Sequence, residues 1–233
     1  MIRAGGPYLA SQRGRYLLNF LSIALVAGVS CFVVGLLVHP VLSLIPLFAA
    51  SPLARRQYSA AARYRKGSLG EDLVSSLLSG LSDEFYLIND IKLPGHRGNI
   101  DHVLVGPCGV VVIETKHYRG LIRCDRDRWF VNGRPVRDIS RQVTSAAIAV
   151  RKSLHGQCSA WPASGQKWVD SVVVFTNPLC RLEVNRPGPS IVRYSQLLTL
   201  IRERAIRHAL NASQASHIAA TLVGLGGPMN RWA

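Results

Sequence analysis

The stretch GNIDHVLVGPCGVVVIETK, residues 98–116, decides the fold of this chain. Two runs rich in β-branched residues, 99–105 and 110–116, lie on either side of the short sequence Gly106-Pro107-Cys108-Gly109. Glycine and proline favour a tight turn, and β-branched side chains favour strands. The stretch therefore predicts two neighbouring antiparallel strands joined by a hairpin.

The register of this hairpin brings three charged residues together. Either a two-residue or a four-residue turn pairs Val105 with Val110, and the same register places Asp101 opposite Glu114. Directly opposed residues have their Cβ atoms about 4.5–5.5 Å apart on one face of the sheet. Lys116 points to that face as well, because side chains alternate along a strand.

Two carboxylates at this separation resist simultaneous ionisation unless a cation lies between them. Hard divalent ions such as Mg²⁺ prefer oxygen ligands, so the pair predicts a metal site that could polarise a phosphoryl group. The alternative is a cross-strand acid pair at a solvated sheet edge, with Lys116 as charge compensation. The apolar residues Val103 and Val112 share this face, which makes an uncompensated charge there costly and favours the functional interpretation.

The elements around the hairpin predict an α/β domain. Helical periodicity, apolar runs and turn residues indicate alternating helices and strands in the order αβββ(ββ)αβα. The run Val169 to Phe175 is almost wholly apolar and predicts an interior strand. The expected elements are a helix at 71–81, strands at 85–93, 99–105 and 110–116, a hairpin at 120–136, a helix at 140–154, a strand at 169–175 and a helix at 195–210.

The paired strands closely resemble the nuclease-related domain, NERD, a branch of the PD-(D/E)XK nuclease superfamily. The resemblance covers roughly residues 65–180 and includes a Gly-x-x-Gly-Glu sequence at 67–71 and a helix that carries Gln142. It implies a restriction-endonuclease-like mixed sheet flanked by helices. It also implies a phosphodiester hydrolase that depends on Mg²⁺ or Mn²⁺.

The resemblance assigns roles to the central residues. Asp101 and Glu114 match the superfamily's metal-binding carboxylates, and the backbone carbonyl of Thr115 matches a further metal ligand. Lys116 matches the catalytic lysine. The proline that precedes the first aspartate in the superfamily is replaced here by Ile100, at a position that varies widely.

Two further residues match the family less directly. Glu71 matches an acid that often reaches the metal through water, although an acid near a helix N-terminus is also favoured by the helix dipole. Gln142 resembles a helix glutamine that orients the site or contacts substrate, although it could equally be a solvated helix residue.

The N-terminal part of the chain is unusually apolar. Residues 16–54 contain no Asp, Glu, Lys or Arg, and Leu17 to Val38 is long enough to cross about 30 Å of hydrocarbon as a helix. Val41 to Leu53 is shorter and interrupted by prolines, so it could be a second span, a re-entrant piece or an interfacial segment. A cleaved signal peptide is the alternative, but its apolar core would be much shorter.

Basic residues flank this apolar region on both sides. The chain carries a net charge of +15, and no acid occurs before Glu71. This distribution predicts a transmembrane segment or hairpin in the cell (inner) membrane, with the soluble domain on the cytoplasmic side. Five scattered cysteines, without metal-type pairs, agree with a reducing compartment.

The domain organisation and partners follow from these features. The +7 carried by residues 71–233 favours a polyanion, so we expect a nucleic acid, DNA more than RNA, besides the lipid bilayer contacted by 16–54. A non-catalytic module that binds nucleic acid or protein at the membrane is the alternative function. The expected parts are a basic cytoplasmic N-terminus at 1–15, a membrane segment or hairpin at 16–54, a basic juxtamembrane linker at 55–66, a nuclease-like domain at 67–210, and a C-terminal helix and tail at 211–233.

Arginines surround the expected strands and could line a groove for phosphates. Tyr118 or Trp129 could stack on bases, although a solvated rim with a buried Trp129 is an equally good interpretation. The arginines concerned are Arg97, Arg119, Arg123, Arg126 and Arg128.

Overall fold

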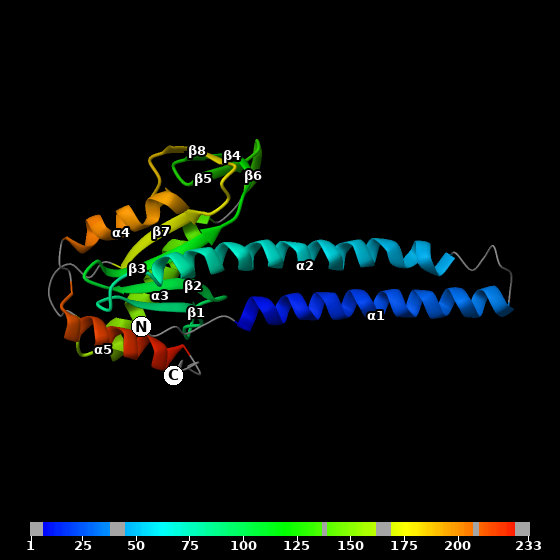
Figure 1. The fold of residues 1–233 in the computed structure, drawn as a ribbon, viewed down its shortest axis with the longest axis horizontal. Helices are drawn as coiled ribbons and strands as arrows, with labels where there is room; N and C mark the ends of the chain where they lie inside the picture. Colours follow the sequence, from blue (N-terminus) through cyan, green and yellow to red (C-terminus); the bar gives the residue numbers. More distant parts are fainter. Residues whose placement is uncertain (1–6, 38–44, 137–138, 162–168, 207–209, 227–233) are drawn as a thin grey trace. The chain divides into compact units, whose positions relative to one another are not determined.

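The computed structural model describes residues 7–37, 45–136, 139–161, 169–206 and 210–226. Within these ranges the chain divides into two compact units, one of residues 7–69 and one that begins at Gly70 (Figure 1). The first unit is helical, and the second contains two β-sheets with helices around them.

Two long helices make up the first unit. α1 spans Pro7–Leu37, and α2 spans Ile45–Leu78 and continues into the second unit. Within the first unit the helices lie side by side, and the rings of Phe20 and Tyr58 are 6.2 Å apart. Over Gly14–Gly35, α1 is long and apolar enough to cross a membrane by length and composition alone, with a mean hydropathy of 2.4.

α2 begins much earlier than the sequence pattern indicates. The prediction placed a new helix at about Glu71, but α2 is continuous through the basic stretch 55–66 and through both Gly67 and Gly70. A helical glycine costs about 1 kcal/mol relative to alanine, which is why the pair was interpreted as a boundary. The alanines, arginines and lysine that precede it are strong helix formers and outweigh this cost.

A five-stranded mixed sheet forms the centre of the second unit. Its first three strands are antiparallel, and the last two pair in parallel with their neighbours. The predicted strands at 85–93, 99–105 and 110–116 are confirmed, and the strand at 169–175 is interior as predicted. In spatial order the strands are β1 (Tyr86–Ile91), β2 (Ile100–Gly106), β3 (Gly109–Lys116), β7 (Val169–Phe175) and β9 (Ser190–Arg193).

A smaller four-stranded sheet follows β3 in the chain. Residues 120–136, predicted as a hairpin, form three antiparallel strands. β8 adds to it in parallel. Neither β8 nor β9 was predicted, although apolar and polar residues alternate in β8; β9 has only four residues and no such alternation. In spatial order the strands are β6 (Arg134–Val136), β5 (Arg128–Val131), β4 (Gly120–Asp125) and β8 (Cys180–Asn185).

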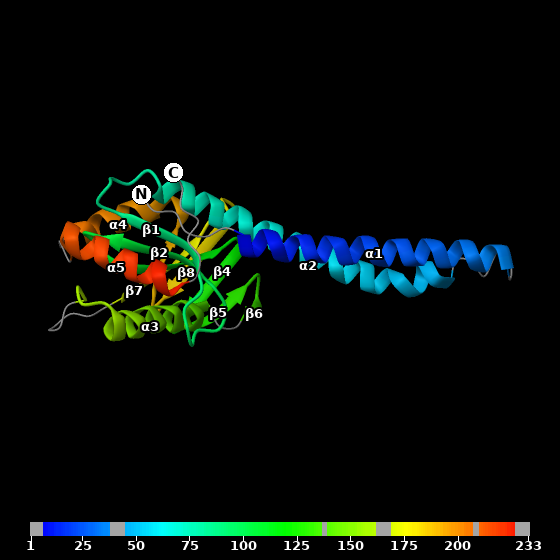
Figure 2. The ribbon, with the colours of Figure 1, turned by 90° about the horizontal axis from the view of Figure 1, so that it is seen from below.

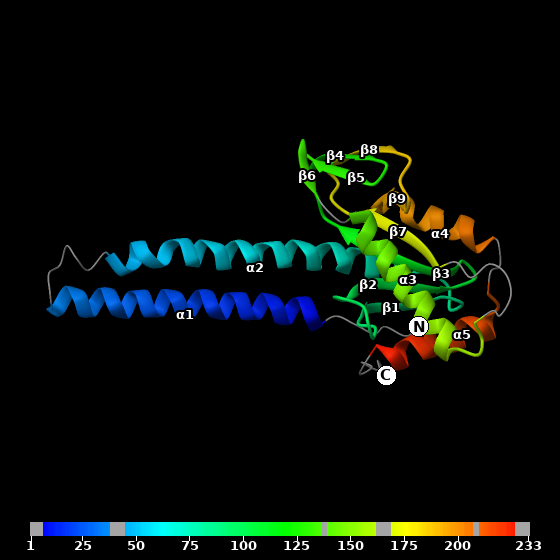
Figure 3. The same ribbon diagram turned by 180° about the vertical axis from the view of Figure 1, so that it is seen from behind.

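Helices cover both faces of the five-stranded sheet. α3 (Ile139–Gln157) and α5 (Ala212–Leu225) pack on one face, as Figures 2 and 3 show. The last turns of α2 and α4 (Leu197–Ala205) cover the other face. α4 ends before the predicted limit of 210 and is preceded by a 3₁₀ turn at Tyr194–Gln196.

Gly70 allows α2 to lie directly on the ends of β3 and β7. A Cβ atom at this position would lie 2.9 Å from Thr176 Oγ1 and 3.1 Å from Thr115 Cγ2. The missing side chain therefore sets how closely the helix approaches the strand that carries Glu114 and Lys116. Gly67, one turn earlier, would meet nothing within 4 Å and has no such role.

We expect Gly70→Ala to destabilise the protein by about 1–3 kcal/mol, because the added methyl group overpacks this contact. Gly67→Ala is the matched control and should be neutral or stabilise by up to about 1 kcal/mol, since alanine favours the helix. Urea unfolding of the two purified variants measures both effects. Equal stabilities for the two variants would show that the contact at Gly70 does not constrain the fold.

Candidate metal-dependent active site

The pairing of β2 with β3 has the predicted register. Val105 pairs with Val110, and the ladder continues to His102 and Ile113. One residue further along the same register, Asp101 and Glu114 come opposite each other. They therefore follow the alternation of Val103, Val105, Val110 and Val112, which all belong to one core cluster on the α3 side of the sheet.

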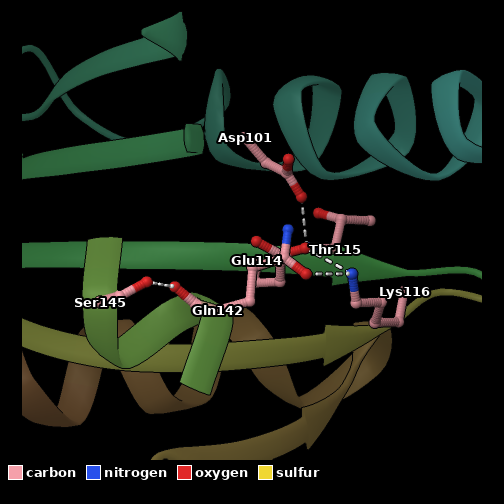
Figure 4. Close-up of polar contacts among 6 residues, drawn as sticks. All are labelled: Asp101, Glu114, Thr115, Lys116, Gln142 and Ser145. Carbon is pink, nitrogen blue, oxygen red and sulfur yellow. Dashed lines mark hydrogen bonds and ion pairs between the residues drawn. The ribbon is translucent and has the colours of Figure 1, made fainter. Parts of the chain in front are cut away.

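Asp101 joins the end of β2 to the backbone of β3. The N–H group of Thr115 donates a hydrogen bond of 2.7 Å to Asp101 Oδ2 (Figure 4). The next carbonyl, that of Lys116, accepts from the Thr176 N–H at 3.0 Å on the β7 side. Because successive carbonyls of a strand point to opposite edges, the Thr115 carbonyl points to the edge where Asp101 lies.

Lys116 is held between a strand and a helix. Its Nζ atom forms an ion pair of 2.5 Å with Glu114 Oε1 and donates a hydrogen bond of 3.0 Å to Gln142 Oε1. Glu114 and Lys116 come from β3, and Gln142 comes from the first turns of α3 (Figure 4). The side chains of Glu114 and Lys116 are only 4% and 16% exposed, so water screens their interaction weakly.

Burial and crowding shift the pKa values of the acids upward. Burial is the main reason that the Asp101 pKa lies well above its usual range, and Glu114 and Glu71 raise it further. Burial also raises the Glu114 pKa, although the Lys116 ammonium opposes this. For Lys116, burial lowers the pKa, but Glu114 outweighs it and the net shift is upward.

Glu71 lies next to the same group of charges. It is half-buried on α2, directly after the close contact of Gly70 with the strand ends. Burial raises its pKa to about 8, with contributions from Asp90 and from Glu114. Glu71 therefore carries a proton in much of the population at neutral pH, in contrast to an ordinary exposed glutamate.

Asp90 is a further neighbour of the site, which the sequence pattern does not predict. In the pairing of β1 with β2, Asn89 lies opposite His102 and Ile91 opposite Ile100, which places Asp90 in register with Asp101. Asp90 has a positive φ of 54° and accepts a 2.5 Å hydrogen bond from Asn99 Nδ2. The long loop between these strands fixes no register by itself, so the sequence alone could not have identified this position.

The donor atoms at this site are of the type that hard divalent cations prefer. Asp101, Glu114 and the Thr115 carbonyl supply only oxygen. Burial raises the pKa of both acids, and a bound cation would favour their ionised forms. Among the residues that the structure describes, no three His, Cys, Asp or Glu side chains are grouped closely enough to hold an ion by themselves. The carbonyl of Thr115 and water would have to complete the coordination.

Trp129, which was considered for base stacking, is buried. It is 2% exposed, its Nε1 donates to Ser140 Oγ at 2.8 Å, and its ring lies 5.9 Å from that of Phe175. Trp129 therefore anchors the smaller sheet to the core. The surrounding arginines are exposed, and two of them pair with acids, Arg123 with Glu183 and Arg128 with Asp125.

We expect Lys116→Met to destabilise the protein by about 3–5 kcal/mol near pH 8, because Glu114 would remain buried without its partner. The Glu114 pKa already lies above its unfolded value, and losing the lysine would raise it further, so the proton is held more tightly in the folded state. The destabilisation should therefore shrink as the pH falls toward 5. Urea unfolding at several pH values measures this dependence.

Gln142→Ala is the control for this experiment, since it removes a neutral hydrogen-bond acceptor from the same ammonium. We expect it to cost about 1 kcal/mol or less with little dependence on pH. A Lys116→Met effect that is equal at pH 5 and pH 8 would contradict the proposed coupling to Glu114.

Comparison with known proteins agrees with the resemblance of the paired strands. Residues 66–176 match the family described as the nuclease-related domain, NERD. An uncharacterized protein from Bacillus anthracis is 38% identical over 61 residues, which cover 24% of this chain and 29% of that protein. The chain thus spans less than a third of the length of this relative.

A solved structure, that of Pyrococcus furiosus SfsA in complex with Ca²⁺, overlaps 63% of this chain and 54% of that one at 12% identity, with a TM-score of 0.26. An overlap with so low a score does not establish a shared fold. The match over residues 66–176 includes both β2 and β3 and every residue from Glu71 to Gln142 discussed above. Residues 66–176 of the chain thus match the nuclease-related domain family.

Proposed function

We propose that this protein is a membrane-anchored, metal-dependent nuclease that hydrolyses phosphodiester bonds of DNA, or less readily of RNA, at the cytoplasmic face. The observation that carries the proposal is the convergence of Asp101, Glu114 and Lys116 at the end of the β2–β3 pair. These residues lie within the segment that matches the nuclease-related domain. The superfamily's restriction-endonuclease-like fold is part of this proposal.

The carboxylates of Asp101 and Glu114 and the carbonyl of Thr115 would hold Mg²⁺ or Mn²⁺. Such an ion supplies Lewis acidity at a phosphoryl oxygen and lowers the pKa of a bound water. The Asp101 carboxylate is kept in place by the Thr115 N–H, so one acid is oriented before any ligand arrives. Pre-orientation of this kind reduces the reorganisation required during reaction.

Lys116 would hold the attacking water or stabilise the negative charge that develops on the phosphoryl group. Its raised pKa keeps it protonated at neutral pH, so it acts as a hydrogen-bond donor and a cation. Gln142 accepts from Lys116 and so restrains the direction in which the ammonium points. Glu71, with a pKa of about 8, would hold a proton and could donate a hydrogen bond toward water in the site.

A non-catalytic nucleic-acid-binding module is the second function that the sequence allows. Its difficulty is that four acids, Glu71, Asp90, Asp101 and Glu114, lie in or next to the site. Those that are ionised repel phosphate unless a cation compensates them. A protein that only bound a polyanion would bind it more tightly if it had the arginines and lacked this group of acids.

Cleavage of plasmid DNA by the full-length protein in detergent tests the proposal. We expect cleavage with Mg²⁺ or Mn²⁺ and none with EDTA. Asp101→Asn, Glu114→Gln and Lys116→Met should each lower the rate by at least about 100-fold. Glu203→Gln, which changes an exposed acid on α4 in the same chemical way, should cleave like the wild type.

Binding data from the same preparations separate the two functions. If the wild-type protein retards DNA equally with EDTA and with Mg²⁺ but never cuts it, the chain is a binding module. If all three site variants cleave at the rate of Glu203→Gln, the catalytic site lies elsewhere.

The membrane anchor is supported by α1. Its apolar stretch Gly14–Gly35 has large side chains open to the surroundings: Leu18, Leu21, Leu25 and Phe32 are each at least 60% exposed. Exposed apolar surface of this extent is unfavourable in water and favourable in hydrocarbon. Basic residues on both sides of residues 16–54, with no acid before Glu71, favour a cytoplasmic position for the domain that follows.

We expect the expressed protein to pellet with membranes after washing with high salt and alkaline carbonate, and to be released only by detergent. Protease should reach the nuclease-like unit in inside-out vesicles but not in intact spheroplasts. Recovery of the protein in the alkaline supernatant would contradict the anchor. Digestion in intact spheroplasts would contradict the cytoplasmic orientation alone.

A further inference from the structure

A groove of about 510 Å³ lies between α1 and α2 in the first unit. Its size falls within the range of roughly 300–1,000 Å³ typical of small-molecule sites. Alanines from both helices line it, namely Ala24 and Ala27 of α1 and Ala50 and Ala54 of α2. The short side chains leave a hollow where larger residues would have closed the contact between the helices.

One end of this groove is polar. Arg55, Tyr58 and Ser59 of α2 line it there, and all three are exposed in the unit. A guanidinium group and two hydroxyl groups are donors suited to a phosphate. The groove thus combines an apolar length with an anion-binding end.

Arg55 of α2 lies beside an apolar part of α1, which is unusual for a charged residue. The ring contact of Phe20 with Tyr58 fixes the alignment of the two helices, and Arg55, one turn before Tyr58, lines the groove together with Ile23. Ile23 lies nine residues inside the apolar stretch Gly14–Gly35, a distance of about 13 Å along the helix. Arg55, the first basic residue after the uncharged segment 16–54, therefore lies alongside the apolar stretch of α1.

A guanidinium group that lines an apolar groove is stabilised by a counter-ion, and residues 1–70 supply no acidic side chain. Ionisable groups within a membrane are costly unless an opposite charge or a polar group compensates them. The counter-ion of Arg55 must therefore come from outside this part of the chain.

We propose that this groove binds one anionic phospholipid, with its phosphate paired to Arg55 and an acyl chain in the alanine-lined hollow. The proposal rests on the membrane anchor proposed above and extends it to a specific lipid site. A phospholipid satisfies both ends of the groove, whereas a free phosphate would leave the apolar length unfilled. Arg56 does not line the groove, so the site distinguishes two adjacent arginines of the same charge.

Native mass spectrometry of the full-length protein tests this site. The protein is purified in mild detergent and mixed with equal amounts of phosphatidylglycerol and phosphatidylcholine that carry the same acyl chains. We expect one phosphatidylglycerol to be retained in preference to phosphatidylcholine. Arg55→Gln should weaken that retention by at least about tenfold, because it removes a charge-assisted pair.

Three further variants sharpen the test. Arg56→Gln should retain phosphatidylglycerol like the wild type, and Arg55→Lys should retain part of the preference, because it keeps the charge but loses the planar fork. Ala54→Leu should reduce binding of both lipids by filling the hollow. Thermal unfolding identifies any variant that is misfolded. If Ala54→Leu does not fold, the comparison of Arg55→Gln with Arg56→Gln, which change exposed side chains, still tests the lipid site.

Equal retention of the two lipids, equal losses in Arg55→Gln and Arg56→Gln, or displacement of the lipid by inorganic phosphate alone would each overturn the lipid site. These measurements do not involve DNA. A protein that cleaves DNA and pellets with membranes but shows no lipid preference would disprove this inference and leave the proposed function standing.

Discussion

The antiparallel pairing of β2 with β3 is the constraint on which the candidate site depends. Its register is fixed by a short turn and by four valines that must face the core together. A shift of one residue would turn Asp101 away from Glu114 and expose the valines to water. The register that buries the four valines is therefore the register that aligns the two acids. Packing of the core thus stabilises the geometry of the site.

The charge balance of the site follows from the packing around it. α2 approaches the strand ends closely because Gly70 has no side chain, and this brings Glu71 next to acids that are already buried. Lys116 is the cation that the structure pairs with Glu114, and it is held in turn by Gln142. Burial raises the pKa values of these carboxyl groups, and one lysine opposes this only in part. The excess of acids over this one lysine gives the site its capacity for a divalent ion.

The parts of the fold that depend on local pattern could be predicted from the sequence. The β2–β3 hairpin, the interior strand β7 and the helix bearing Gln142 follow from apolar periodicity and turn residues. Parts that depend on tertiary contacts could not. α2 continues through two glycines because its flanking residues favour a helix, β8 and β9 are stabilised by neighbouring strands, and Asp90 reaches the site only through the pairing of β1 with β2. Lys116 contacts Gln142, while the catalytic roles of both residues remain predictions.

A crystal structure of the full-length protein soaked with Mn²⁺, with anomalous diffraction recorded, would show whether Asp101 and Glu114 share a metal ion. We expect an anomalous peak within coordination distance of both the Asp101 and Glu114 carboxylates and of the Thr115 carbonyl oxygen. A folded protein in which Mn²⁺ occupies another position, or in which Asp101 and Glu114 face opposite sides of the sheet, would contradict this expectation.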